Sequence, residues 1–393
     1  MNKFLVVDFG ASLNHTHHKQ SIFAFSTLLA KEHIDFDVWI PIGSEIENAD
    51  IKLRRILLPG THPCQLRITK INTWLPATLS KLHNIAATYR IKFILLILLY
   101  ITALYFNVLF KIRCRNEKIS IIFTTTCPFS LTAIYLMEIF RIEVDIHCRI
   151  TNTAEVRGVL SEIVTLDIFK EKVKNFKYVN VFFGFETKAL LNKNKNETDS
   201  RLFISKFPSE QKKLIKEMNS ENFTISFLGF PTRNKGHDRI GSIIKKVGEK
   251  RPNYLWQVQL YQDDPLIHEL NELNLSIKIL EGKISRELMI DSLKNSTLIC
   301  LPYDVDAFKY NSSAMMYEST DYLVPVITFC GSAFATDVDD FSCGVTVKDQ
   351  DEMINKMINL DSNLVSDWTR GCSSYNHYRN KSNLIFLNLN SQI

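Results

Sequence analysis

Several common signatures are missing from this chain of 393 residues. No two of its eight cysteines are spaced as CxxC, which argues against a structural zinc site. The apolar run at the N-terminus stops at Asp8 and is too short for a signal peptide, so we expect a first β-strand there. No internal repeat is visible. These absences favour an ordinary globular protein in a reducing cytoplasm.

Acidic residues are also absent from one long segment. Between positions 51 and 116 there are eleven Lys or Arg residues and no Asp or Glu, although the net charge of the chain is only +5. Such a basic stretch predicts an anionic partner, either lipid headgroups or nucleic acid. Its basic residues flank an apolar run instead of interleaving with exposed aromatic residues. Nucleic acid is therefore the less favoured partner, and we expect none.

The apolar run, residues 93–110, has eighteen residues without a charge, and three interpretations of it stay open. Its length suits a transmembrane span, its basic flanks suit a helix docked on an anionic membrane, and its composition also suits a buried core helix. A single span would put the strands before and after it on opposite sides of a bilayer, so they could not share one sheet. We expect peripheral docking on the inner face of the plasma membrane, through this run and its flanks Arg90, Lys92, Lys111, Arg113 and Arg115.

The rest of the chain alternates between strand-like and helix-like segments. Strands are expected at 3–7, 36–40, 120–123, 144–150, 178–183 and 202–205, and then at 224–229, 256–261, 276–280, 298–301, 326–329 and 344–347. This alternation predicts an α/β fold with two Rossmann-like, doubly wound domains facing across a cleft. The predicted domains are residues 1–208 and 223–367, and the tail 368–393 is expected to pack back as a helix.

The first functional motif follows an apolar strand that ends at Gly229. The loop after this glycine delivers Arg233 and Lys235 to the start of a helix. Cations beside helix N-terminal amides are suited to a diphosphate, because both stabilise negative charge. A solvated surface loop is the plain alternative. We predict that Arg233 and Lys235 bind the diphosphate of a nucleotide-activated sugar, the donor of a sugar group.

The second motif follows the strand that ends at Leu301-Pro302. Its polar loop opens a helix that carries one carboxylate, Glu318. A serine at the helix start leaves backbone amides free to bind a phosphate, and a carboxylate further along suits the hydroxyls of a ribose. We predict phosphate contacts for Ser312 and Ser313, and ribose or base contacts for Glu318, Tyr303 and Tyr310, with helix capping and aromatic packing as the alternatives.

The first domain offers candidates at the carboxyl ends of its strands, where ligands bind in such folds. His17 belongs to a histidine-rich loop after the first strand, and no Asp or Cys nearby completes a metal site. His147 and Arg149 share one face of a strand because they are two residues apart. We predict that His17 and His147 contact the reacting sugar and that Arg149 binds the phosphate. Glu186 is a weaker candidate, and a surface loop or a buried polar pair are the alternatives.

The order and spacing of these motifs resemble the C-terminal half of retaining GT-B glycosyltransferases of the family 4 type. Lys235-Gly236 matches that family's pyrophosphate loop, and Glu318 followed by Pro325-Val326-Ile327 matches its ribose-binding segment. There are two departures. Phe230 stands where the family usually has an arginine, a role that Arg233 would take over, and Tyr310 stands where it often has a second glutamate.

The resemblance implies an enzyme that moves a hexose from a nucleotide sugar to a glycan acceptor with retention of configuration, without a bound metal and without a cofactor. The membrane-facing first domain suggests a lipid-linked acceptor, as in the synthesis of bacterial O-antigen, capsule or lipopolysaccharide core. Two alternatives stay open. One is a nucleotide-sugar 2-epimerase on the same fold, and the other is a non-catalytic partner of a polysaccharide synthase.

Overall fold

A computed structural model describes residues 3–8, 17–41, 51, 53–56, 118–126, 128–151, 166–194, 200–210 and 223–389 of the protein. These residues divide into two compact units. Unit 1 comprises residues 1–186, 191–208 and 382–393, and unit 2 comprises residues 187–190 and 209–381. The last helix therefore belongs to unit 2 over most of its length and to unit 1 at its end.

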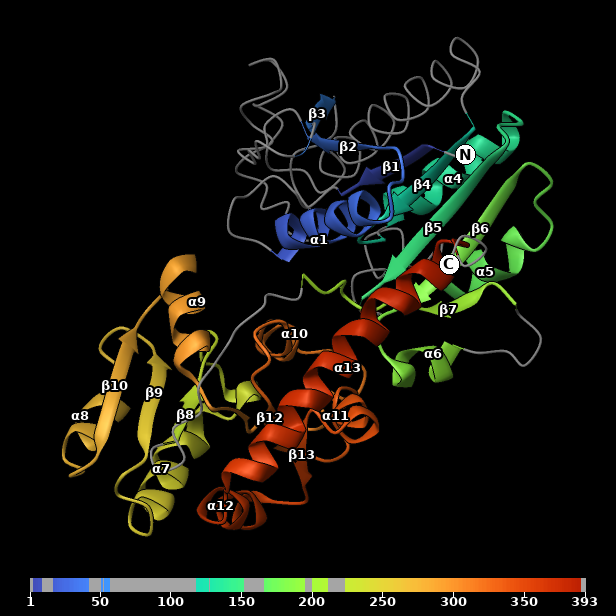
Figure 1. Ribbon diagram of the computed structural model, residues 1–393. Coiled ribbons are helices and arrows are strands. Elements are labelled where there is room, and N and C mark those ends of the chain that lie inside the picture. The colour runs from blue at the N-terminus through green and yellow to red at the C-terminus, as the bar shows by residue number, and fades with distance from the viewer. Residues whose placement is uncertain are drawn as a thin grey trace, which may run out of the picture. The chain divides into compact units, whose positions relative to one another are not determined.

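Unit 1 is built on a parallel sheet of seven strands, in the order β3-β2-β1-β4-β5-β6-β7 (Figure 1). The strands are β1 (Lys3–Val7), β2 (Phe36–Pro41), β3 (Leu53–Ile56), β4 (Ile119–Phe123), β5 (Val144–Ile150), β6 (Val179–Phe185) and β7 (Leu202–Ile204). The helices are α1 (His17–Lys31), α4 (Pro128–Ile139), α5 (Leu166–Val173) and α6 (Lys188–Asn194), the last of which begins in unit 2.

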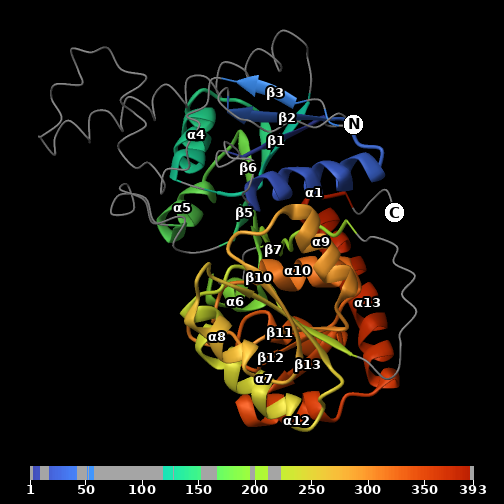
Figure 2. The ribbon, with the colours of Figure 1, turned by 90° about the vertical axis from the view of Figure 1, so that its left-hand side faces the viewer.

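Helices cover both faces of this sheet. Figure 2 shows α1 on one side of the strands and α4 and α5 on the other. Ile22, Phe25 and Leu29 of α1 share one core with Phe4 and Val6 of β1, and these five side chains are buried. The spacing of the α1 residues puts them on one stripe of the helix, so the apolar period in the sequence becomes the packed face.

Unit 2 has a parallel sheet of six strands, in the order β10-β9-β8-β11-β12-β13. The strands are β8 (Thr224–Phe227), β9 (Leu255–Leu260), β10 (Ser276–Glu281), β11 (Leu298–Leu301), β12 (Val326–Phe329) and β13 (Gly344–Val347). The helices are α7 (Ile240–Gly248), α8 (Pro265–Asn271), α9 (Arg286–Asn295), α10 (Ala314–Asp321), α11 (Ala335–Phe341), α12 (Gln350–Ile358) and α13 (Ser362–Phe386), with short 3-10 helices η3 (Arg233–Lys235) and η4 (His237–Arg239).

One large core lies between this sheet and the helices α7, α8 and α12. Ile243 and Val247 of α7 and Met353 of α12 meet the buried strand residues Ile225 and Val258 in it. The alternation of buried parallel strands and helices is that of a doubly wound sheet. The predicted α/β class with two such sheets is thus confirmed.

In both sheets the strand order reverses beside the first strand of the unit. β1 lies next to β4 in unit 1, and β8 lies next to β11 in unit 2. Ligands of open α/β sheets bind outside the carboxyl ends of the strands at such a reversal. This is the edge at which both predicted motifs of unit 2 begin.

One strand, β3, was not expected from the sequence. Its four residues include Arg54 and Arg55, so it carries little of the apolar pattern that predicts a strand. It lies at the edge of its sheet, where charged side chains are common because they discourage pairing with another chain.

Candidate functional site

The two predicted motifs of unit 2 meet at the carboxyl ends of β8 and β11. The backbone N–H of Asp304 donates to the carbonyl oxygen of Asn234 at 2.9 Å. The Nη1 of Arg239 donates to the carbonyl oxygen of Pro302, also at 2.9 Å. Gly236 lies so close to the second loop that an added Cβ would stand 2.1 Å from that same Pro302 oxygen, and its φ is 74°. The loops are therefore held together, and glycine is required at this contact.

Lys235 lies inside this junction. It is partly buried, and its Nζ is 3.6 Å from the place that a Cβ on Gly229 would take. Among the described residues no carboxylate or other hydrogen-bonding group contacts this amine. Burial lowers the pKa of Lys235 below its ordinary value, because the charged form is partly desolvated. A partly desolvated cation without a partner is a suitable contact for an anionic ligand. The other predicted cation of this loop, Arg233, is exposed to solvent.

The start of α10 lies at the same place. The methyl carbon of Met315 is 3.5 Å from the Cβ position of Gly229. Ser313 caps the helix, and its Oγ accepts a hydrogen bond of 3.2 Å from the N–H of Met316. The first amides of a helix have no partner within the helix, so they face outward with partial positive charge. Lys235 and the N-terminus of α10 thus converge on Gly229. Ser312, predicted to bind phosphate, precedes the cap and is partly buried.

Glu318 lies one turn into α10 and forms an ion pair. Nη1 of Arg286, the first residue of α9, donates to its Oε2. The side chain of Glu318 is 18% exposed and that of Arg286 is 43% exposed. The carboxylate is thus reachable from solvent and already bound to one cation. Its contact with a ribose stays a prediction.

The two tyrosines of the second loop lie in different surroundings. Tyr303 is buried, with its ring 4.7 Å from that of Phe308 and 5.9 Å from that of Phe334. Burial raises its pKa well above the ordinary value, although a hydrogen bond with Ser313 opposes this. This placement favours packing over the predicted base contact. Tyr310 is partly buried, and its carbonyl oxygen accepts a 2.9 Å hydrogen bond from the hydroxyl of Thr187.

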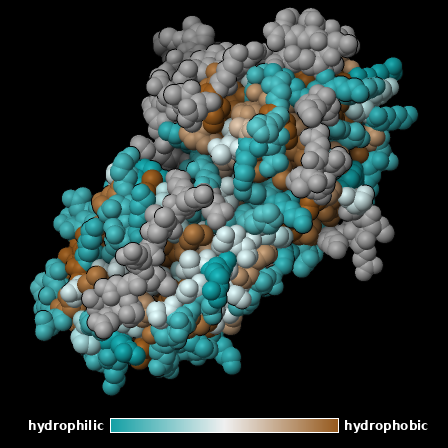
Figure 3. Space-filling view, viewed as in Figure 1, coloured by the Kyte–Doolittle hydropathy of each residue, from teal (hydrophilic) through white to brown (hydrophobic). Residues whose placement is uncertain are grey.

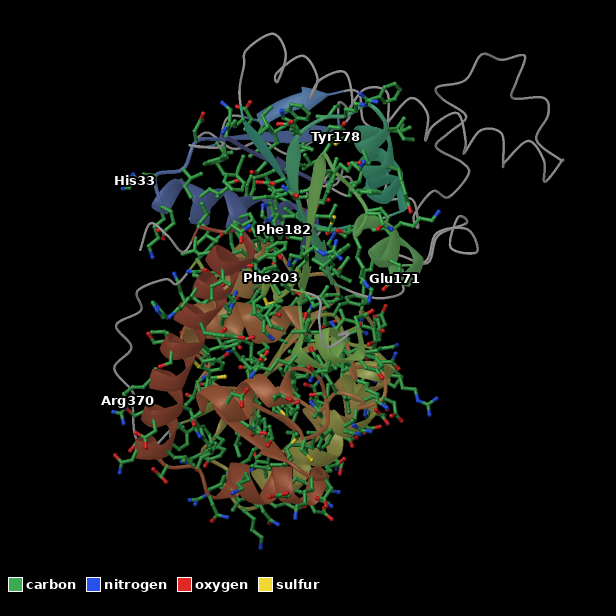
Figure 4. The ribbon with its side chains drawn as sticks, turned by 90° about the vertical axis from the view of Figure 1, so that its right-hand side faces the viewer. His33, Glu171, Tyr178, Phe182, Phe203 and Arg370 are labelled. Atoms are coloured by element: carbon green, nitrogen blue, oxygen red, sulfur yellow. The ribbon has the colours of Figure 1, made fainter. Side chains whose placement is uncertain are left out.

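His147 lies in the core of unit 1. It is 1% exposed, and its ring stacks on that of Phe182 at 5.0 Å. Phe182 and its neighbour Phe203 are labelled in Figure 4. Nδ1 of His147 donates to the carbonyl oxygen of Phe386 at 2.9 Å. Burial lowers its pKa to about 4, so the ring is neutral at pH 7. The position favours a packing role over the predicted catalytic one. His17 is the first residue of α1.

Arg149 is also buried, at the carboxyl end of β5. Its Nη2 is 2.6 Å from Oε1 of Glu186, and its Nη1 donates to the carbonyl oxygen of Thr124 at 3.2 Å. The hydroxyl of Thr124 in turn donates to the carboxylate of Asp8, which follows β1 and is fully buried. The guanidinium therefore already has an anionic partner. This placement favours a structural ion pair over the predicted phosphate contact.

Sequence reasoning missed two polar groups beside Lys235. Oε1 of Gln259 accepts from the N–H of Gly229 at 2.9 Å, and Nε2 of Gln259 donates to the carbonyl oxygen of Gly282, also at 2.9 Å. Nε2 of His237 is 2.7 Å from Oδ2 of Asp264. Together they border a small pocket lined by Phe227, Leu228, Gly229, Pro231, Lys235, His237, Ile240, Gln259, Cys300, Pro302 and Tyr303. The only sequence signal for Gln259 was a polar residue near the end of an apolar strand.

In the described part of the chain, no group of three or more His, Cys, Asp or Glu side chains could hold a metal ion, and independence of metal stays a prediction. In the same residues, no helix has the length and hydropathy of a transmembrane span. Residues 93–110 lie outside the described residues.

No family model matches the chain, and no curated protein sequence matches it. Solved structures are similar to it over nearly their whole length. A UDP-forming α,α-trehalose-phosphate synthase from Burkholderia xenovorans has a TM-score of 0.60 and 11% identity, with 99% of each chain covered. A sucrose-phosphate synthase from Thermosynechococcus elongatus has a TM-score of 0.59 and 12% identity, with 100% of this chain and 98% of the other covered. A trehalose-6-phosphate protein from E. coli, bound with UDP-2-fluoro glucose, has a TM-score of 0.58 and 11% identity, with 98% of each chain covered. The chain therefore has the GT-B fold.

Proposed function

We propose that this protein is a glycosyltransferase that uses a nucleotide sugar as donor. The proposal rests on one observation: the amine of Lys235 is partly buried and has no partner among the described residues. It lies beside Gly229 and the N-terminus of α10, at the carboxyl edge of the second sheet of a GT-B fold. The bound UDP-2-fluoro glucose in the similar E. coli protein supports this donor class.

The chemistry follows from where charge develops. When the bond between the sugar and the diphosphate breaks, negative charge grows on the leaving phosphate. Lys235, Arg233 and the first amides of α10 would stabilise that charge in the transition state. Retention of configuration, proposed from the family resemblance, would need no separate general base, because the leaving phosphate can take the proton of the acceptor hydroxyl.

The acceptor is proposed to be a glycan, most simply a lipid-linked one of bacterial envelope polysaccharide synthesis. This part rests on the basic, acid-free segment of the sequence and the apolar run inside it. Two similar structures are named instead as synthases of trehalose phosphate and sucrose phosphate. Sugar phosphates therefore belong in the acceptor panel beside lipid-linked glycans.

The membrane part of the proposal has its own test. Docking through residues 93–110 and their basic flanks combines apolar insertion with electrostatic attraction, and only the second is screened by salt. Binding to vesicles of anionic lipid should weaken in high salt without vanishing. Binding that is equal for neutral and anionic vesicles would contradict the electrostatic half, and no binding to either would contradict membrane docking.

The donor class is tested by thermal shift of the whole chain against a panel of nucleotide sugars, followed by product analysis with the donor that stabilises it. Transfer of the sugar to an acceptor supports the proposal. Conversion of the donor sugar to its 2-epimer would show the epimerase alternative. Donor binding with neither transfer nor hydrolysis would show a non-catalytic partner, and no stabilisation by any nucleotide sugar would refute the proposal.

A further inference from the structure

One arginine of unit 2 is completely buried and takes no part in the site described above. Arg379 lies on α13 and is 0% exposed, although hydrophilic residues cover much of the unit 2 surface that is visible in Figure 3. Burial of a charge is costly unless hydrogen bonds and an opposite charge compensate for the lost water. The groups that compensate Arg379 therefore show which part of the unit the arginine holds in place.

Several of these groups belong to α10, the helix whose N-terminus lies beside Lys235. Nη1 of Arg379 is 3.0 Å from Oδ1 of Asp321, the last residue of α10. The same nitrogen donates to the carbonyl oxygen of Tyr317 at 3.1 Å, and the guanidinium carbon lies 4.8 Å from the centroid of the Tyr317 ring. Tyr317 directly precedes Glu318. Arg379 thus contacts the second half of α10, behind the amides that face the anion site.

Two further hydrogen bonds hold the same end of α10. Nδ2 of Asn376, three residues before Arg379 on α13, donates to the carbonyl oxygen of Thr320 at 2.6 Å. The hydroxyl of Ser209 donates to Oδ1 of Asp321, also at 2.6 Å. The last carbonyl groups of a helix have no partner within it, and a cation is favoured at that end. α10 has eight residues and is therefore about 12 Å long at 1.5 Å per residue, so contacts that fix its last turn also fix its first.

We propose that Arg379 and Asp321 are positioning residues, which hold α10 so that its first amides and Lys235 bind the same phosphate. This inference rests on the function proposed above. Neither residue touches the ligand itself. The methyl carbon of Met315, in the first turn of α10, is 3.5 Å from the Cβ position of Gly229, and Nζ of Lys235 is 3.6 Å from it. A hydrogen bond is lost when donor and acceptor separate beyond about 3.5 Å, so a small displacement of α10 would remove its amides from a phosphate held by Lys235.

The test separates affinity from stability, with calorimetry of the full chain at a temperature well below Tm. Arg379→Met leaves Asp321 without its cation, so Tm should fall. Binding of pyrophosphate and of UDP should both weaken by about 10-fold or more, the scale of a lost hydrogen bond to a charged group.

A double variant, Arg379→Met with Asp321→Asn, leaves no unpaired charge and should recover most of the lost Tm. Its affinity for both ligands should stay weak, because α10 still lacks this contact. Arg379→Lys keeps the charge and should restore part of the affinity. Met357→Ala is the matched control, since Met357 is a fully buried core residue of α12 in the same unit. It should lower Tm by creating a cavity and leave both affinities within about 2-fold of the wild type, because the polar contacts of α10 remain.

Three outcomes would overturn the positioning role and leave the proposed function intact. The first is wild-type affinity in Arg379→Met, which would make the arginine purely structural. The second is a double variant that regains affinity together with Tm, because binding would then follow stability. The third is an equal loss of affinity in Met357→Ala. If Arg379→Met does not fold, the double variant and Arg379→Lys decide the question by the same comparison. A wild-type chain that binds neither pyrophosphate nor UDP would overturn both this inference and the proposed function.

Discussion

Replacement of Lys235 by methionine should change activity and stability in opposite directions. Methionine keeps most of the length and apolar volume of the side chain and removes the ammonium group. That group is partly buried with no partner among the described residues, and burial has lowered its pKa. In the folded chain without ligand, the buried ammonium group therefore lowers the free energy of unfolding. When a diphosphate is bound, the same group forms a favourable contact with it.

The magnitudes follow from these two states. Loss of one donor that stabilises transition-state charge lowers turnover by about 100-fold or more. Removal of a partly buried polar group that lacks a partner should raise the free energy of unfolding by about 1 kcal/mol, or about 2–4 °C in Tm for a domain of this size. A stability gain with an activity loss is typical of a residue retained for function.

The pH dependence of stability is a second test, because the lowered pKa of Lys235 fixes the direction in which stability changes with pH. The folded chain holds the proton of Lys235 less tightly than the unfolded chain, whose ordinary pKa is 10.5. Between the lowered folded pKa and 10.5 the unfolded chain binds more protons, so this residue makes stability rise with pH in that window. Lys235→Met should lose that rise. Donor affinity of the wild type should fall over the same window as the amine loses its charge.

The assays are thermal unfolding from pH 7 to 10.5 and donor turnover at saturating nucleotide sugar. Lys246→Met is the control, because Lys246 is an exposed lysine of the same unit, paired with Asp351 at 3.2 Å. It should leave turnover unchanged and stability nearly so, since exposed ion pairs contribute little. A Lys235→Met protein with near-normal turnover, or one that is less stable than the wild type at pH 7, would refute the reasoning.

Three further predictions concern neighbouring contacts. Glu318→Gln should weaken nucleotide affinity by about 10-fold through loss of a charged acceptor, whereas Arg286→Gln should not; equal effects in calorimetry would reduce Glu318 to a structural ion pair. Glu186→Gln leaves Arg149 buried without its anion and should lower the free energy of unfolding by about 3–5 kcal/mol, so an unchanged denaturation midpoint would contradict that ion pair. Gly236 has a φ of 74°, and a Cβ added there would lie 2.1 Å from the carbonyl oxygen of Pro302. Gly236→Ala should therefore lower both Tm and pyrophosphate affinity; a variant with normal affinity would show that the two loops can separate without harm to the site.

The sequence by itself was sufficient for the fold class and for most strands. Buried parallel strands are short apolar runs, and the helices between them carry a helical period, so both are local signals. The edge strand β3 was not predicted because Arg54 and Arg55 interrupt the apolar pattern. The two loops of unit 2 were also visible locally, since each follows a strand and opens a helix. That they lie together follows from the order of parallel strands, and the Asn234–Asp304 hydrogen bond shows it directly.

Only the tertiary structure decided what each polar or aromatic side chain touches. His147 and Arg149 share a strand face, as their spacing requires, but burial and contacts with Phe386 and Glu186 occupy both. Phe230 and Tyr261 are thirty-one residues apart and meet only because β8 and β9 pair. A local pattern fixes which way a side chain points along its own element. Whether it then meets solvent, an opposite charge or another ring depends on residues distant in the chain, and that is set by strand order and packing.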